Sequence, residues 1–356
     1  MTSTQIEVPA IRRDWPTEEV TAARLAAPTR VHRPLSTVLY PLALAVPALA
    51  AVLIGVGWWT GWGGYSFSAS LVGLRLVEIG PLALALIGAS LIAERIRPAQ
   101  RRPLIARGHR HDVLFLVLNG AVLLPVMTAL SLSFTEILQR ALPWIVLPKT
   151  ALLPRWTAVA LIFVAMDFCN WLVHLANHRV QMLWRFHELH HSEEDMNVLT
   201  VFRTHPLIHV SYLLAVVPGI VLLANGALST LALVLYGGMV AFAHSNTNLG
   251  FGPLGRVFVS PNFHRIHHRI DGAQDVNLGF VLSIWDQLSR RAVWPTADTI
   301  RADTGLPGRP LRVENEGPRA HHLAVLATQL VAPFRPVGGP SELPSIRDTE
   351  LQERVH

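Results

Sequence analysis

Long runs of apolar residues alternate with short polar segments along the first two thirds of the chain. Ser36 to Trp59 carries no charged residue, Leu76 to Ala93 contains only Glu78, and Val113 to Leu132 again carries none. Each run is long enough to cross a bilayer as an α-helix, which takes about 17 to 25 residues. The pattern therefore predicts membrane-spanning helices from Ser36 onward.

Three later runs extend this pattern. Trp156 to Val173 is a fourth candidate, and Leu207 to Ala224 with Ala227 to Ala243 forms a hairpin-like pair. The composition agrees, because 51% of the residues are hydrophobic, only 15% are charged and the mean hydropathy is +0.37, whereas soluble domains are about 25% charged. We predict an all-α integral membrane protein with four to six transmembrane helices.

Arginine supplies almost all of the positive charge, because Lys149 is the single lysine in a chain with a formal charge of +6 and a pI near 10.3. Two segments carry many of these arginines: Arg12, Arg13, Arg24, Arg30 and Arg33 before the first run, and Arg95, Arg97, Arg101, Arg102, Arg107 and Arg110 after the second. Arginines that flank apolar runs are typical of cytoplasmic loops, so we expect no nucleic-acid partner. The scarcity of lysine indicates a GC-rich bacterial genome, and hence a bacterial plasma membrane.

These features divide the chain into four parts. We expect a cytosolic N-terminal tail at 1–35 without a cleavable signal peptide, N-terminal transmembrane helices at 36–155, and a helical catalytic domain at 156–295 that includes a membrane hairpin at 207–243. A cytosolic tail follows at 296–356, in which the amphipathic piece from His322 to Phe334 packs on the domain or lies on the membrane surface. The lone Cys169 excludes an intramolecular disulfide framework and a cysteine-based zinc site.

Histidine is concentrated in one stretch, since eleven of the 17 histidines lie between His174 and His268. The spaced groups are H-x-x-x-H at His174 and His178, H-x-x-H-H at His187, His190 and His191, a single His244, and a second H-x-x-H-H at His264, His267 and His268. Residues three or four apart share one face of a helix, so each group can present its imidazoles together. A single pair of histidines is typical of a membrane boundary. Repeated groups indicate a metal site, because buried imidazoles without partners cost stability. Counting the crossings places all of these groups on the cytoplasmic side.

The number of histidines predicts more than one metal ion. Nine imidazoles exceed the four protein ligands of a structural zinc or the three of a catalytic one, whereas two ions fit. Imidazole suits iron, copper, zinc and nickel alike. Ligand type therefore excludes magnesium and calcium without selecting the element.

The fourth apolar run joins the membrane to this chemistry. Asp167, Trp171, His174 and His178 are spaced by four, three and four residues, so they line one stripe of a helix. A carboxylate within an apolar segment is costly unless it is paired. We weigh two roles for Asp167: it accepts the second ring N–H of a ligating histidine, or it bonds to backbone, Arg155 or Arg179.

Two other functions compete with this interpretation. His187, Glu188 and His191 satisfy H-E-x-x-H, the zinc metalloprotease motif, which would make the chain an intramembrane protease, although this leaves the other histidines unexplained. The second alternative is a non-catalytic membrane protein that binds or moves metal ions. Transport needs polar groups within several helices, and apart from Asp167 and His209 the runs offer few.

The order of the motifs resembles the fatty acid hydroxylase superfamily, which includes sterol desaturases, sterol methyl oxidases and alkylglycerol monooxygenases. The resemblance covers about Leu161 to Leu288 and rests on the combination of motifs. These are D-x-x-x-W-x-x-H-x-x-x-H from Asp167, L-W-x-x-H-x-x-H-H from Leu183, R-x-H-P from Arg203, H-x-N from His244, P-x-x-H-x-x-H-H from Pro261 and N-x-G-x-x-x-x-x-W-D from Asn277.

The resemblance implies a membrane-embedded helical protein whose cytosolic histidine boxes hold two irons and use O2 to attack an unactivated C–H bond of a lipid. The ligands it implies are His174, His178, His187, His190, His191, His244, His264, His267 and His268. Asn248 takes the place of a further histidine and implies a water-bridged ligand, and His205 matches a recurrent family histidine of lower rank. Electrons would come from a separate ferredoxin-like or cytochrome b5-like donor with its reductase, because the chain has no H-P-G-G segment.

Local sequence supports the second box and leaves other positions open. Ser260 followed by Pro261 predicts a capped start for the helix that carries His264. Asp275 suits a loop, while Asn277 and Asp286 either orient imidazoles or cap loops. Ile208 stands where many family members have an acidic residue, which leaves the contacts around R-x-H-P undefined.

Overall fold

The computed structural model of the chain describes residues 69–102, 109–123, 134, 137, 140–144, 154–216, 230–272, 275–306 and 319–334. The predicted tail at 1–35, the first apolar run and residues 217–229 of the hairpin lie outside this part. The described residues form helices and loops, with three isolated antiparallel bridges and no β-strand. The prediction of a helical protein is confirmed for this part of the chain.

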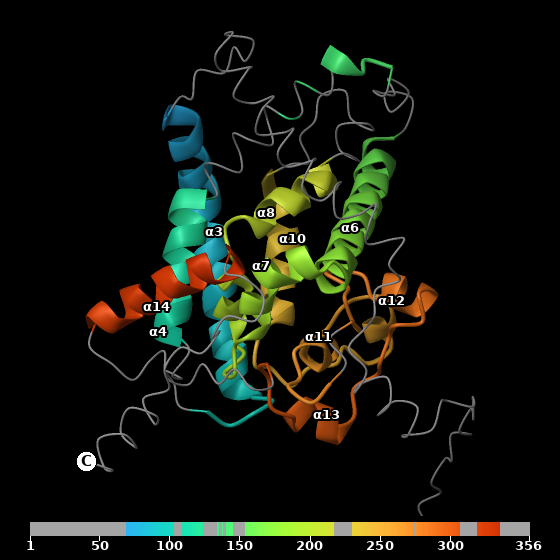
Figure 1. Cartoon of the computed structure of the whole chain (residues 1–356). Coiled ribbons are helices and arrows are strands. Elements are labelled where there is room, and N and C mark those ends of the chain that lie inside the picture. Colours follow the sequence, from blue (N-terminus) through green and yellow to red (C-terminus); the bar gives the residue numbers. More distant parts are fainter. Residues whose placement is uncertain are drawn as a thin grey trace, which may run out of the picture.

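Upright helices form one half of the fold (Figure 1). They are α3 (Ala69–Ile96), α4 (His109–Val117) with the π-helix η1 (Leu118–Leu123), α6 (Arg155–Arg179) and α10 (Thr230–Ala243). Among the described residues, Thr157–Arg179 is the helix that is long and apolar enough to cross a membrane. The count of four to six crossings therefore stays a prediction.

Helix α6 has two different faces. Leu161, Val164, Phe168 and Leu172 are 40 to 48% exposed, and their spacing of three, four and four places them on one side. The neighbouring, inward side contains buried Asp167 and the first histidines. A continuous helix with an apolar outer face and a polar inner face suits contact with lipid on one side and with a polar site on the other.

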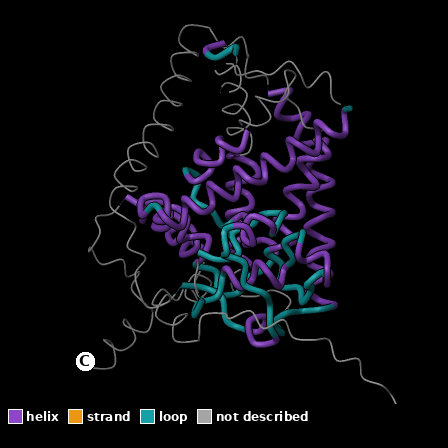
Figure 2. Tube along the Cα trace, turned by 90° about the vertical axis from the view of Figure 1, so that its right-hand side faces the viewer, coloured by secondary structure: helices purple, strands orange, loops and turns teal. Residues whose placement is uncertain are grey.

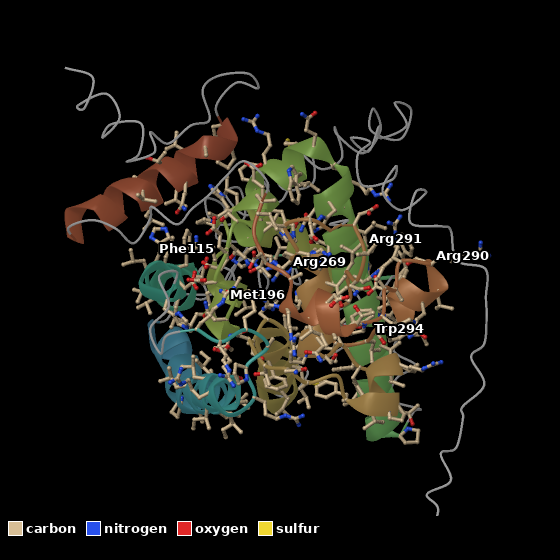
Figure 3. The ribbon with its side chains drawn as sticks, turned by 90° about the horizontal axis from the view of Figure 1, so that it is seen from below. Phe115, Met196, Arg269, Arg290, Arg291 and Trp294 are labelled. Atoms are coloured by element: carbon tan, nitrogen blue, oxygen red, sulfur yellow. The ribbon has the colours of Figure 1, made fainter. Side chains whose placement is uncertain are left out.

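Short helices and loops form the other half, where the teal loops gather in Figure 2. The short helices of this half are α7 (Gln181–His191), η3 (Val198–Phe202), η5 (Gly252–Arg256), α11 (Pro261–His267), α12 (Ile284–Leu288) and α13 (Ala297–Arg301). Two further short helices, α8 (Ile208–Ser211) and η4 (Tyr212–Val216), lie among the upright helices (Figure 1). The chain turns from α6 into α7 at Val180, whose extended backbone (φ −98°, ψ 111°) ends the longer helix. Arg269, Arg290 and Arg291 lie at this loop-rich end, seen from below in Figure 3.

A buried ion-pair network joins the two halves. The Nε of Arg203 lies 2.8 Å from Asp112 Oδ1, and the same guanidinium pairs with Glu193. Asn197 donates to the other oxygen of Asp112 at 2.9 Å. Removing one partner of a buried ion pair costs about 3–5 kcal/mol, so this network fixes α4 against the segment that follows the first histidine box.

The predicted amphipathic piece near the C-terminus is helical, as α14 (Arg319–Val331) and η7 (Ala332–Phe334). It packs on the domain, because Phe334 contacts Phe186 with ring centroids 5.5 Å apart. Gln329 also lies 2.6 Å from the Nε2 of His111. The expectation that this segment packs on the domain therefore agrees with the structure.

Candidate metal centre

The structure brings all nine predicted histidines together in two groups. Cluster 1 contains His174, His178, His187, His191 and His267, and cluster 2 contains His190, His244, His264 and His268. Within each cluster the candidate ligand atoms lie within 4.8 Å of one another. This is close to twice the metal–imidazole bond length of about 2.0–2.1 Å, so each cluster can surround one ion.

The two H-x-x-H-H boxes contribute to both clusters in a reciprocal way. In the first box, the outer residues His187 and His191 join cluster 1 and the middle residue His190 joins cluster 2. In the second box, the outer residues join cluster 2 and His267 joins cluster 1. Positions i and i+4 lie nearly above one another on a helix, while i+3 lies to one side. The spacing therefore lets one short helix supply ligands to two neighbouring ions.

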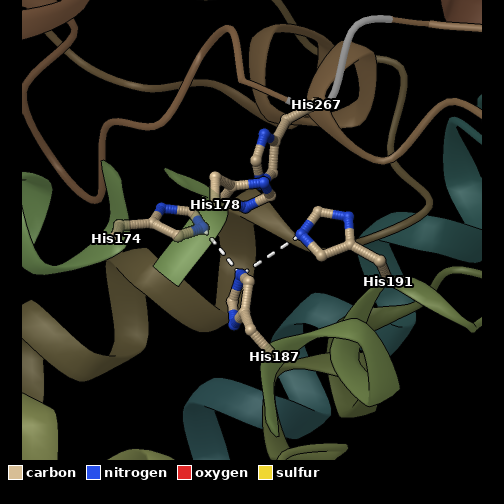
Figure 4. Close-up of side chains that lie close together, drawn as sticks. All are labelled: His174, His178, His187, His191 and His267. Carbon is tan, nitrogen blue, oxygen red and sulfur yellow. Dashed lines mark hydrogen bonds between the residues drawn. The ribbon is translucent and has the colours of Figure 1, made fainter. Parts of the chain in front are cut away.

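The converging atoms are Nε2 nitrogens. In cluster 1, the Nε2 of His187 lies 3.1 Å from that of His174 and 3.2 Å from that of His191 (Figure 4). In cluster 2, the Nε2 of His244 lies 3.0 Å from those of both His190 and His264. Such short separations place ring nitrogens around a common point in each cluster.

Backbone carbonyls fix the tautomer of three ligands. The Nδ1 of His174 donates to Leu278 O at 2.8 Å, that of His267 donates to Val276 O at 2.9 Å, and that of His244 donates to Val240 O at 2.7 Å. A proton on Nδ1 leaves the Nε2 lone pair free, as in metal-binding histidines. At about 3 Å from a neighbouring Nε2, such a lone pair can accept a hydrogen bond from the neighbouring ring or, when both rings carry their protons on Nδ1, bind a shared cation.

Burial keeps the imidazoles in their ligand form. Buried ring nitrogens of seven of the nine histidines have no hydrogen-bond partner among the described residues. Burial, followed by the neighbouring imidazoles, holds the pKa of His187, His191 and His268 well below the usual value, and burial lowers that of His244 to about 4. Neutral imidazole is the form that binds metal, so the donor set fits two metal ions.

The predicted contact between Asp167 and a ligating histidine is wrong. The carboxylate instead accepts four hydrogen bonds of 2.9–3.1 Å, from the hydroxyl of Tyr236, Nε1 of Trp285 and the backbone N–H groups of Val281 and Leu282. These donors satisfy a buried carboxylate without a cation. Asp167 therefore ties α6 to the loop after the second box, and the alternative of a backbone-bonded carboxylate is the closer one.

Asp286 supports cluster 1 through the same loop. It accepts hydrogen bonds from Trp171 Nε1 at 2.9 Å and from the backbone N–H groups of Leu278 and Gly279 at 3.0 and 2.8 Å. Since Leu278 presents its carbonyl to His174, Asp286 orients that imidazole through one peptide. A Cβ at Gly279 would lie 2.7 Å from the carbonyl oxygen of Leu282 and 3.0 Å from Asp286, which explains the glycine in N-x-G.

Asn277 and Asp275 have loop roles. Asn277 has a left-handed backbone (φ 53°), and its amide donates to the carbonyls of Phe263 and Val293 at 2.8 Å. Asp275 pairs with Arg179 and Arg291. The expectation for Asp275 is confirmed, and Asn277 closes the loop rather than contacting an imidazole.

Two candidate cofactor-binding residues have other partners. Asn248 is exposed, and its Oδ1 accepts a hydrogen bond from Asn262 at 3.0 Å, so the amide is engaged away from the histidines. His205 uses both ring nitrogens, because Nε2 donates to Leu330 O at 3.0 Å and Nδ1 accepts from Leu207 N–H at 3.1 Å. Both side chains therefore have protein partners, and their cofactor roles stay predictions. His205 contacts α14 and η7.

The sequence analysis did not identify several supporting residues. Tyr236 and Trp285 satisfy Asp167, and the need of a buried carboxylate for donors is a signal that could have led to them. Trp184 packs on His178 and His191, with ring centroids 5.1 and 5.4 Å apart. His178 is the half-buried member of cluster 1.

Comparisons with known proteins agree with this site. Residues 159–290 match the fatty acid hydroxylase family. Over 140 residues the chain is 32% identical to the ornithine lipid hydroxylase OlsE of Rhizobium tropici, which covers 38% of this chain and 41% of that protein. It is also 30% identical to the alkylglycerol monooxygenase of Caenorhabditis elegans over 140 residues (37% of this chain, 26% of that protein) and 31% identical to the human enzyme over 139 residues (35% and 28%).

The family match at 159–290 covers the part of the chain that carries the nine cluster histidines. The matches to the relatives span less than half the length of each of these proteins. No solved structure matches the chain.

Proposed function

We propose that this protein, whose residues 159–290 match the fatty acid hydroxylase family, is a membrane-bound di-iron oxygenase that hydroxylates or desaturates an unactivated C–H bond of a lipid. The observation that carries the proposal is the convergence of nine imidazoles in two adjacent clusters of five and four. The relatives named as a lipid hydroxylase and as alkylglycerol monooxygenases support a lipid substrate.

Two irons account for the donor set better than other metals. All nine ligands are neutral imidazoles, which suit iron, copper, zinc and nickel but not magnesium or calcium. A redox reaction of the kind named for the relatives requires a metal that changes oxidation state, which zinc does not do. Iron also agrees with the family.

The irons, when bound, supply the oxidising power from O2 and external electrons. The protein residues hold and orient them. His174, His244 and His267 direct Nε2 inward because their Nδ1 protons are held by carbonyls. The buried surroundings exclude water from the site, which limits side reactions of a strong oxidant.

The lipid would reach the site from the membrane. The exposed apolar stripe of α6 from Leu161 to Leu172 faces away from Asp167, so the helix can lie between lipid and metal. We further propose that the clusters lie on the cytoplasmic side of a bacterial plasma membrane, beside the arginine-rich loop after α3. A separate ferredoxin-like or cytochrome b5-like protein with its reductase would deliver the electrons.

A zinc metalloprotease fits the site less well. His187 and His191 of H-E-x-x-H share cluster 1 with three further histidines, whereas catalytic zinc uses three protein ligands and keeps an open position. Cluster 2 would have no role in such an enzyme. A non-catalytic metal-binding protein stays possible in chemical terms and is separated from the proposal by the assay below.

The test is oxygen consumption on lipid. Full-length protein from iron-supplemented cells is mixed with a total lipid extract, a ferredoxin, its reductase and NADPH. We expect lipid-dependent O2 uptake and products that are heavier by one oxygen or lighter by two hydrogens in mass spectrometry. An iron-replete protein that transfers no oxygen and removes no hydrogen from any lipid fraction, with each of the two donor types, would contradict the proposal.

A further inference from the structure

A cavity of about 680 Å³ lies between α3 and α4. Its wall includes Leu91, Arg95 and Val113 but none of the nine cluster histidines. Met196, which also lines it, is labelled in Figure 3 beside these two helices. The cavity is therefore a separate feature from the metal centre.

The cavity is apolar at one end and basic at the other. On α3, Leu91 precedes Arg95 by about one turn, and on α4, Val113 follows His109 by about one turn. A turn advances about 5.4 Å. Arg95 lies near the C-terminal end of α3 and His109 begins α4, so these two basic residues lie at the helix ends that the connecting segment joins. Leu91 and Val113 each lie about one turn further into their helices.

Positive charge dominates the loop end. Arg95, Arg101 and Arg102 line the cavity, against the carboxyls of Asp195 and Glu94. Arg102 is paired with Asp195 at 2.6 Å, and Arg95 donates to the carbonyl oxygen of Arg102 at 3.4 Å. The exposed guanidinium groups of Arg95 and Arg101 add to the positive charge of the wall. Burial raises the pKa of Glu94 to about 7, so its negative charge is incomplete at neutral pH. The remaining positive charge suits an anion.

The cavity also lies close to cluster 2. Asn246 lines its wall and follows His244 by two residues, a distance of at most about 7 Å along an extended chain. Glu94 holds this segment, because its Oε1 accepts hydrogen bonds from the N–H groups of Asn246 and Val198 at 3.1 and 2.7 Å. A molecule in the cavity is thus next to the segments that leave the metal centre.

We propose that this cavity binds the acidic group of the lipid substrate, a phosphate or carboxylate, with its apolar chain at the Leu91 and Val113 end. The inference rests on the proposed function in taking the substrate to be a lipid. An arginine fork binds phosphate and carboxylate oxygens through two parallel hydrogen bonds. A molecule with an acidic end and an apolar chain matches both ends of the cavity, whereas a free anion matches one.

The experiment measures lipid binding by the full-length protein in detergent. The probes are a fluorescent short-chain phosphatidic acid and the phosphatidylcholine of the same chain length, with inorganic phosphate as competitor. The test variant is the double substitution Arg95→Gln and Arg101→Gln, which leaves the Arg102–Asp195 pair intact. The matched control is Arg256→Gln, an exposed arginine of η5 whose carbonyl contacts α12, on the other side of the fold from α3 and α4 (Figure 1).

We expect wild-type protein to prefer phosphatidic acid and the double variant to bind it about 10-fold more weakly or worse, as for the loss of charge-assisted hydrogen bonds. Arg256→Gln should bind like wild type. Equal affinity for both lipids, or unchanged binding by a folded double variant, would overturn the proposal. Inorganic phosphate that binds as tightly as phosphatidic acid would make the ligand a soluble anion and overturn it as well.

Metal-depleted protein separates this proposal from the proposed function. Binding is repeated after iron removal, and we expect the preference for the acidic lipid to persist. If binding is intact but no lipid is oxidised, the proposed function fails alone. If the enzyme oxidises a neutral lipid and the cavity binds no acidic one, the head-group site fails alone.

Discussion

The two histidine clusters use the same motifs but are oriented by different parts of the fold. Two ligands of cluster 1 donate their Nδ1 protons to carbonyls of the loop at 276–278. In cluster 2, His244 donates to Val240, which precedes it by four residues at the end of α10. Cluster 1 is thus oriented by a tertiary loop contact and cluster 2 by a local helical one.

This difference predicts that the clusters respond separately to substitutions. Cluster 1 has five histidines and depends on the loop that Asp167 and Asp286 hold. Cluster 2 has four, and Glu94 of α3 holds the segment that follows His244. Loss of a ligand should therefore be more damaging in cluster 2, and loss of a loop contact more damaging in cluster 1.

The largest expected effect comes from His190→Ala. It removes one of the four histidines of cluster 2, so we expect iron to fall from about two to about one per chain. Lipid oxidation should fall by more than about 100-fold, which exceeds the loss that follows when only a residue bonded to a metal ligand is changed. Elemental analysis and the O2 assay measure both. The protein should still insert in the membrane, and an active, metal-replete variant would count against the site.

A smaller effect is expected from Asp286→Asn, which leaves one acceptor oxygen for three donors. Loss of such support typically lowers metal affinity by about 10–100-fold, and here it should affect one of the two irons. Chelator titration measures this as a biphasic release. Asp271→Asn is the control, because that exposed carboxylate contacts Arg269 outside both clusters; equal weakening of both irons would refute the division.

His178→Ala tests the surplus ligand in cluster 1. His178 is the half-buried member of a group of five, so four imidazoles remain, enough for a stable site. We expect both irons to be retained at saturating metal, with affinity reduced by about 10-fold or less. Loss of iron as complete as in His190→Ala would show that the clusters do not differ in this way.

The smallest effect concerns the support of cluster 2. Burial raises the pKa of Glu94 from 4.5 to about 7, partly offset by hydrogen bonds from Val198 and Asn246 and by the charges of Arg102 and Arg265. A raised pKa in the folded state means that this residue's stabilising contribution is complete below about pH 4.5 and is lost as the pH rises through 7. Glu94→Gln should remove this pH dependence, worth about 3 kcal/mol in total, which thermal unfolding between pH 5 and 8 would reveal. If the stability of Glu94→Gln depends on pH as strongly as that of wild type, another titratable group causes the pH dependence.

The sequence predicted the candidate ligands better than the residues that support them. Eight of the nine histidines follow from their spacing, because i, i+3 and i+4 positions share one face of a helix, whereas His244 is a single residue that was included by its motif. The helix start at Ser260 and Pro261 was also predicted correctly, since Ser260 caps the N–H of Phe263 at 3.2 Å. Such local features depend on neighbouring residues.

The supports depend on contacts between distant segments, which spacing does not encode. The sequence indicated that Asp167 needed partners, but the donors come from α10 and from residues 281–285. Similarly, the carbonyl that accepts the hydrogen bond from His174 Nδ1 belongs to Leu278, which lies 104 residues away in the sequence. His205 was selected by its motif, whereas its ring holds the C-terminal helix.

The metal content of each chain tests the di-iron assignment most directly. Elemental analysis of full-length protein purified in detergent from iron-supplemented cells should give close to two irons per chain, falling to about one in His264→Ala. About one zinc per chain, unchanged by His264→Ala, would contradict the di-iron assignment and favour the H-E-x-x-H site in cluster 1.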